Sequence, residues 1–189
     1  MKRVAALLGG ILGRGGDFED GFREEFTGLF LKEYWDQRLR VEQERVTRSG
    51  GALGMALVRL RFHPEVAEDT SLRCSVVQAA GAIIRENLRI ADVAARQGYD
   101  LHVLFPDTDS LGVMFVAGRI KERLDAWLFE HAATVGDRVQ VLAGVASFPD
   151  DVSDPSSLVA AVSKALDHAG RSGDGRLVCY GRASEEVGL

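Results

Sequence analysis

Residues 89–106 read RIADVAARQGYDLHVLFP, and this stretch decides the fold. Two short apolar runs, Val93–Arg96 and Leu101–Phe105, have the composition of strands and flank a tight turn around Gly98. The next residues, Pro106–Ser110, form a turn and offer an N-cap to a following helix. The stretch therefore predicts a β-hairpin that leads directly into a helix.

The segments on both sides of this hairpin alternate between helical and strand-like patterns. Helices are expected over Thr27–Arg48, Ser75–Leu88, the segment from Ser110 to Leu128, and Asp154–Ala169. Further strands are expected over Ala52–Phe62, Val139–Phe148 and Arg176–Tyr180. Gly144, inside a predicted strand, indicates a bulge or a close backbone approach. The order predicts an α/β (α+β) fold with a central, mostly antiparallel sheet of about five strands plus hairpin, flanked by helices.

Composition limits the classes of function. The chain has 189 residues, of which 46% are hydrophobic and 27% charged, as in a soluble domain with a short appendage. A net charge of -5 argues against broad binding to nucleic acid polymers or anionic membranes. Cys74 and Cys179 lack metal-ligand spacing and are expected to be reduced thiols in the cytoplasm. The apolar run Val4–Leu12 is too short to span a bilayer, so no membrane insertion is expected.

Several segments resemble the GGDEF (diguanylate cyclase) family in order and spacing. The similar segments are Phe26–Phe30 (FTGLF, family L-T-G-L-[YF]), Phe105–Thr108 (FPDT, family L-P-D-T), Ala143–Ala146 (AGVA, family S-I-G-V-A) and Ala165–Ala169 followed by Gly173 (family A-L-Y-x-A-K-x-x-G-R-N). The resemblance implies a lead-in or linker over residues 1–24, a degenerate GGDEF domain over 25–182 and a tail over 183–189.

The hairpin turn departs from the motif that names the family. It is one residue short, so either Gly98–His102 or Gln97–Leu101 replaces the motif. We prefer the second register, because it keeps Leu101 at the apolar phenylalanine position. In both registers at most one acid survives, and the glycine pair that lets a GTP phosphate approach is broken.

The resemblance also implies Mg²⁺ held by carboxylates of the hairpin and of a D-x-D-x-F-K strand. The corresponding strand reads VRLRFH over Val58–His63, with Arg59 and Arg61 at the two acid positions, where they would repel a metal ion. Positions implied for reading guanine and binding phosphate carry unsuited residues, namely Ala67, Cys74, Gly170 and Asp174. We therefore expect no catalytic residues, no metal site, no cofactor and no cyclase activity. Arg59 and Arg61 could form a new anion site, or be solvated or paired with Asp100, which we slightly favour.

One functional motif of the family is retained. Arg89-Ile90-Ala91-Asp92 matches the R-x-x-D product-inhibition site, and Arg119 lies where a further arginine usually assists. Arginine pairs bidentately with guanine or phosphate, and an aspartate accepts from guanine N–H groups. The same pattern recurs at Arg14/Asp17 and Arg171/Asp174, where it is expected to have no such role, and exposed Arg–Asp pairs usually contribute little. Position and Arg119 favour the first copy.

The resemblance thus predicts a catalytically inactive domain that acts as a cyclic-di-GMP receptor or regulatory module in bacterial second-messenger signalling. Its ligand site would comprise Arg89, Asp92 and Arg119. A protein partner and a ligand-linked homodimer would follow from that role. The alternative is a nucleotide-independent protein-interaction or dimerisation scaffold in a bacterial signalling complex. An enzyme with altered chemistry is the least favoured interpretation.

Overall fold

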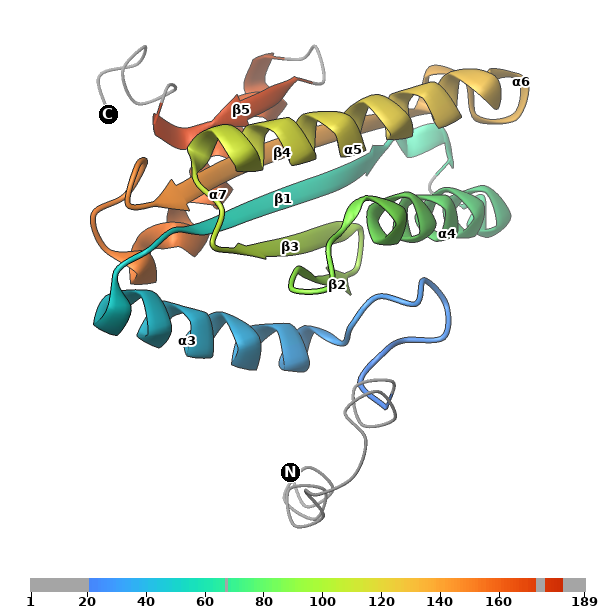
Figure 1. Cartoon of the computed structure of the whole chain (residues 1–189). Helices are drawn as coiled ribbons and strands as arrows, with labels where there is room; N and C mark the ends of the chain where they lie inside the picture. The colour runs from blue at the N-terminus through green and yellow to red at the C-terminus, as the bar shows by residue number, and fades with distance from the viewer. Residues whose placement is uncertain (1–20, 67, 173–175, 182–189) are drawn as a thin grey trace.

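The hairpin forms one edge of a five-stranded sheet in a computed structural model that describes residues 21–66, 68–172 and 176–181 (Figure 1). The strand order is β2-β3-β1-β4-β5; every neighbouring pair is antiparallel except β4 and β5. The elements, labelled as in Figure 1, are α3 (Lys32–Ser49), β1 (Leu53–Phe62), α4 (Thr70–Asn87), β2 (Val93–Gln97), β3 (Asp100–Pro106), α5 (Ser110–Glu130), α6 (Ala132–Val135), β4 (Val139–Phe148), α7 (Leu158–Ser172) and β5 (Leu177–Cys179). The predicted fold class is confirmed, and the short α6 is an addition.

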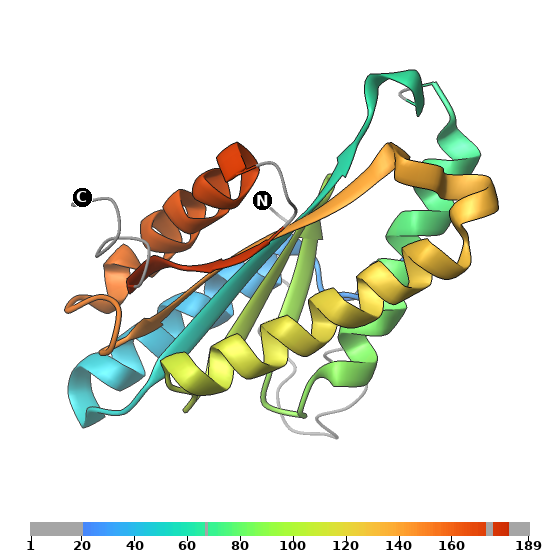
Figure 2. The same ribbon diagram turned by 90° about the horizontal axis from the view of Figure 1, so that it is seen from above.

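Helices cover both faces of the sheet, as Figure 2 shows, with α4 and α5 on one side and α3 and α7 on the other. Because side chains alternate along a strand, β1 serves two hydrophobic cores. Val58 and Leu60 pack with the buried residues of α4 and α5, whereas Met55 and Leu57 pack with those of α3 and α7. The sheet is therefore buried on both faces, which explains why β1 and β4 are almost continuously apolar.

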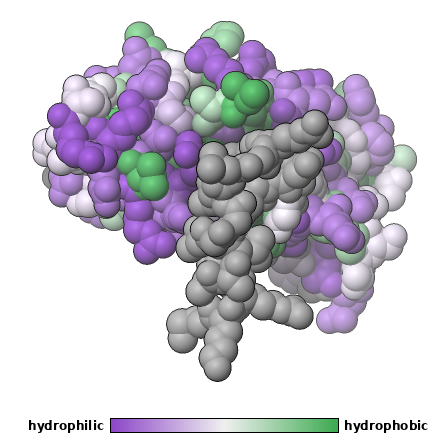
Figure 3. Space-filling view, turned by 60° about the horizontal axis from the view of Figure 1, so that its bottom comes forward, coloured by the Kyte–Doolittle hydropathy of each residue, from purple (hydrophilic) through white to green (hydrophobic). Residues whose placement is uncertain are grey.

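The chain before α3 is not helical, although the pattern predicted a helix from Thr27. Gly28 has a φ of 68°, and the Phe30 amide donates to the carbonyl of Ala94 in β2 at 2.8 Å. The segment therefore turns at Gly28 and then runs along the edge of β2. Its contact with β2 outweighs its local preference for a helix. The outward face of α3 is polar, and the side of the molecule seen in Figure 3 is largely hydrophilic.

Two other sequence features are explained by the fold. Helix α4 begins at Thr70 rather than Ser75, because the Asp69 carboxylate caps it by accepting from the Leu72 amide at 2.9 Å. Gly144 marks a close approach and not a bulge, since β1 and β4 pair without interruption through it. A Cβ atom at Gly144 would lie 2.4 Å from the backbone nitrogen of Leu166 in α7.

The predicted lead-in lies mostly outside the described residues. Residues 1–20, with the apolar run Val4–Leu12 and the pair Arg14/Asp17, belong to that part, as do 182–189. Within the described ranges, no helix has the length and apolar character needed to cross a membrane.

Candidate functional site

The hairpin turn is a two-residue connection between β2 and β3. Gln97 pairs with Asp100, and Gly98 takes a left-handed φ of 62° in the turn between them. Leu101 is fully buried in the core shared with α4 and α5, whereas His102 points to the opposite face. Leu101 thus fills an apolar core position, which the preferred register requires. The choice between the two registers stays a prediction.

Arg59 and Asp100 form a bidentate ion pair at the end of the sheet. They lie opposite each other on β1 and β3, and Arg59 Nε and Nη2 each donate to one Asp100 oxygen at 2.7 Å. The hydrogen bond to Asp100 is the main cause that raises the pKa of Arg59. Arg61 donates instead to Gln140 and to the Gly170 carbonyl. Pairing with Asp100, one of the three alternatives for these arginines, therefore holds for Arg59.

This arrangement does not suit Mg²⁺, which the family resemblance implied. A cation needs carboxylate oxygens, and both oxygens of Asp100 are already bound by a guanidinium group. Across residues 21–66, 68–172 and 176–181, no three His, Cys, Asp or Glu side chains cluster as metal ligands. Of the other positions singled out, Cys74 is partly buried on α4, and Ala67 and Asp174 lie outside the described residues.

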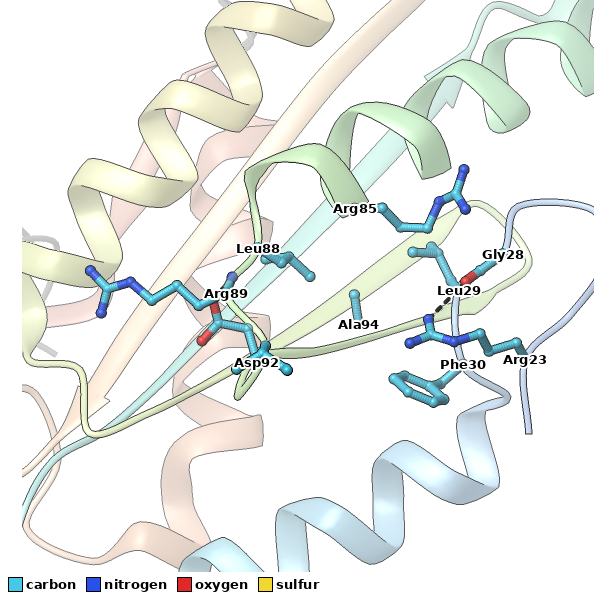
Figure 4. Close-up of a pocket in the computed structure, with 10 residues that line it drawn as sticks. Arg23, Gly28, Leu29, Phe30, Arg85, Leu88, Arg89, Asp92 and Ala94 are labelled. Carbon is cyan, nitrogen blue, oxygen red and sulfur yellow. Dashed lines mark hydrogen bonds between the residues drawn. The ribbon is translucent and has the colours of Figure 1, made fainter. Parts of the chain in front are cut away.

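A cleft of about 480 Å³ lies beside the R-x-x-D motif (Figure 4). One wall is the end of α4 and the start of β2; the other is the segment that precedes α3. Its charged lining comprises Arg23, Arg85, Arg89 and Asp92, and its apolar lining Leu29, Phe30, Leu88 and Ala94. Both the volume and the mixture of an apolar floor with a few charged groups are typical of small-molecule sites.

Arg89 and Asp92 enclose a tight turn at the edge of this cleft. The Asp92 carboxylate accepts from the Arg89 backbone amide at 2.8 Å, and the Asp92 amide donates to the Arg89 carbonyl at 3.1 Å. Burial raises the pKa of Asp92, against the lowering effects of that hydrogen bond and of the Arg89 charge. The Arg89 side chain is exposed and extends away from Arg23 and Arg85 in Figure 4. The motif therefore presents the Asp92 carboxylate, held by the Arg89 amide, and the solvent-exposed guanidinium group of Arg89.

Arg119 lies nearby but does not line the cleft. Its Nη2 donates at 3.0 Å to the carbonyl of Asn87, the last residue of α4, and its guanidinium group lies 5.7 Å from the Phe115 ring. Arg119 thus caps the C-terminal end of α4. The structure brings it to the helix end that precedes Arg89, without placing it in the same cavity.

Two arginines of the cleft, Arg23 and Arg85, were not predicted from the sequence. Arg85 lies four residues before Arg89, and this spacing was a signal that could have been used. Arg23 Nη1 donates to the Gly28 carbonyl at 3.0 Å, and its guanidinium carbon lies 3.9 Å from the centre of the Phe30 ring. No local pattern relates Arg23 to the motif, because only the tertiary fold places its segment against β2.

Comparison with known proteins assigns the family. The family model for the diguanylate cyclase GGDEF domain matches residues 22–176. No curated protein shows a significant match.

Solved structures share the fold. The GGDEF domain of DgcB from Caulobacter crescentus, solved with c-di-GMP, is 16% identical over 89% of this chain and 98% of its own, with a TM-score of 0.73. Diguanylate cyclase SiaD from Pseudomonas aeruginosa, solved with its activator SiaC, is 23% identical over 95% of this chain and 66% of its own, with a TM-score of 0.69. A sensory box/GGDEF protein from Caulobacter crescentus is 25% identical over 80% and 99%, with a TM-score of 0.63. Because the family model spans most of the chain and these folds agree with it, the chain belongs to the GGDEF domain family.

Proposed function

We propose that this chain is a GGDEF domain without cyclase activity that serves as a cyclic-di-GMP receptor in cytoplasmic signal transduction. The observation that carries the proposal is the cleft beside Arg89 and Asp92. It combines the retained R-x-x-D motif with two further guanidinium groups above an apolar floor. The DgcB domain, which shares this fold, was solved with c-di-GMP, and this supports the choice of ligand.

The loss of catalysis rests on the Arg59–Asp100 pair. Metal-assisted attack on a GTP phosphate needs carboxylates free to hold Mg²⁺. Here the one acid that survives in the hairpin turn is bound at both oxygens by Arg59. Arg61, at the second acid position, adds positive charge on the same strand. A cation would have to displace the guanidinium group of Arg59 and then face Arg61, so we propose that neither Mg²⁺ nor another cofactor takes part.

The ligand chemistry matches the cleft. A cyclic dinucleotide carries two phosphodiesters for arginine to bind and two guanines whose N–H groups can donate to Asp92. A guanine ring can also lie against the apolar side chain of Leu88 in the lining. Arg119 would contribute indirectly, by fixing the end of α4 from which Arg89 projects.

Calorimetric titration with cyclic-di-GMP tests the receptor role. The wild type should give saturable heat, and Arg89→Ala should bind about 10- to 100-fold more weakly, as expected for loss of a charge-assisted hydrogen bond. Absence of heat with the wild type, or full affinity in Arg89→Ala, would refute it. Incubation with GTP and Mg²⁺ should yield no cyclic-di-GMP; measurable turnover would refute the inactivity.

A nucleotide-independent interaction scaffold is the second candidate, and exposed apolar residues on α5 favour it. Leu111, Phe115 and Phe129 are 70%, 69% and 82% exposed. SiaD, which shares this fold over 66% of its chain, was solved in complex with an activator protein. The scaffold interpretation predicts self-association or partner binding that Phe115→Ser weakens and that cyclic-di-GMP does not change.

A further inference from the structure

The two walls of the cleft come from segments that are far apart in the chain. Arg85 and Arg89 belong to the end of α4 and the turn after it, whereas Arg23, Leu29 and Phe30 belong to the segment before α3. A ligand that fills the cleft must therefore contact both segments.

Arg85 and Arg23 converge on one residue, Gly28. Arg23 donates to the Gly28 carbonyl at 3.0 Å, and a Cβ atom at Gly28 would lie 2.6 Å from Nη1 of Arg85. Figure 4 shows the two side chains reaching Gly28 from opposite walls. The space that the glycine leaves is what allows the Arg85 guanidinium to rest there.

Arg85 is a guanidinium group of the cleft that no described residue neutralises. Arg85 makes no hydrogen bond or ion pair with the residues that the structure describes, and its side chain is exposed. Asp92 is the single carboxylate of the lining, and one of its oxygens already accepts from the Arg89 backbone. Arg85 thus adds positive charge to the cleft beside Arg23, and positive charge attracts an anion.

We propose that Arg23 and Arg85 form a phosphate-binding pair across the cleft, so that the phosphodiester ligand links the segment before α3 to the end of α4. The inference rests on the proposed receptor function and adds two ligand contacts outside the R-x-x-D motif. Arginine suits this role because its planar fork bridges phosphate oxygens.

Binding would then stabilise the segment over residues 22–31. Backbone hydrogen bonds already hold this segment in place: Glu24 to Leu29 and Leu31 to Phe22 within it, and Phe30 to Ala94 in β2. It continues directly into α3. A phosphate held between Arg23 and Arg85 adds a link that opening of the segment would break, so ligand and segment stabilise each other.

Titration of variants with cyclic-di-GMP tests the pair. Arg85→Ala and Arg23→Ala should each bind about 10- to 100-fold more weakly than the wild type. Arg48→Ala, an exposed arginine at the end of α3 outside the cleft, should bind as the wild type does. Because Arg85 has no partner among the described residues, its variant should keep the wild-type melting temperature without ligand, which separates a binding defect from a folding defect.

Hydrogen exchange supplies a second readout. Saturating ligand should slow exchange of the Glu24, Phe30 and Leu31 amides in the wild type, and do so less in Arg85→Ala at equal occupancy. If Arg89→Ala is impaired but Arg23→Ala and Arg85→Ala bind normally, the phosphate-binding pair is refuted and the receptor function stands. If the wild type does not bind cyclic-di-GMP, both are refuted.

Discussion

His102 should make the folded domain sensitive to mild acid. It is 9% exposed on the α3 side of the sheet, with its ring 5.2 Å from that of Trp35. Neither ring nitrogen has a hydrogen-bond partner within the described part of the chain. Burial, and secondarily the charge of Lys32, lower the pKa of His102 from 6.5 to about 4, although Asp100 and Asp36 act in the opposite sense.

The sign and size of the effect follow from this pKa. Since the unfolded chain takes up the proton near pH 6.5 and the folded domain only near 4, stability falls as the pH drops through that window. Between pH 7 and pH 5 this single group should cost about 2 kcal/mol of unfolding free energy. With a urea m-value of about 2 kcal/mol/M, the unfolding midpoint should fall by about 1 M from this cause.

Urea unfolding of the wild type and of His102→Phe at both pH values isolates the contribution. Other titrating groups, among them Asp92 and Glu24, are common to the two proteins and cancel in the difference. The variant should lose about 2 kcal/mol less than the wild type on acidification. His102→Leu should behave like His102→Phe, which shows that titration and not ring stacking is responsible. Equal pH dependence in all three proteins would refute the reasoning.

Two further substitutions test the packing and the charge pair. Gly144→Ala should lower the unfolding free energy by about 2–3 kcal/mol, because the added Cβ atom would lie 2.4 Å and 2.6 Å from backbone atoms of α7. A melting temperature within about 2 °C of the wild-type value would contradict this close packing. A double-mutant cycle with Arg59→Ala and Asp100→Ala should give a coupling energy of about 1 kcal/mol. The value is modest because the Arg59 side chain is 41% exposed. Additive effects of the two substitutions would contradict the bidentate pair.

Much of the fold could be predicted from local patterns. Alternation and turn chemistry located β1, the hairpin and β4. Gly144 indicated a bulge or a close backbone approach, and the structure shows the close approach. The start of α3 was predicted too early, because the residues from Thr27 to Leu31 were included in the helix although they contain Gly28, a poor helix former that here takes a φ of 68°. What excludes them from the helix is a hydrogen bond to Ala94, some sixty residues away along the chain by the numbering.

Sequence patterns brought together only those cleft residues that are close in the chain, and their binding role stays a prediction. Arg89 and Asp92 lie three residues apart, and both line the cleft. Arg119 was placed by analogy with the family, and the structure puts it on the Asn87 carbonyl instead of in the cavity. Arg23 joins the cleft through chain topology, which no local pattern encodes.

Equilibrium dialysis against cyclic-di-GMP, with excess GTP and Mg²⁺ as competitor, tests the central claim most directly. A receptor whose hairpin acid Asp100 is held by Arg59, and whose ligand binds beside Arg89 and Asp92, should bind cyclic-di-GMP saturably. GTP should neither displace the ligand nor be converted to it. Failure to bind cyclic-di-GMP, or its displacement by GTP, would contradict the account.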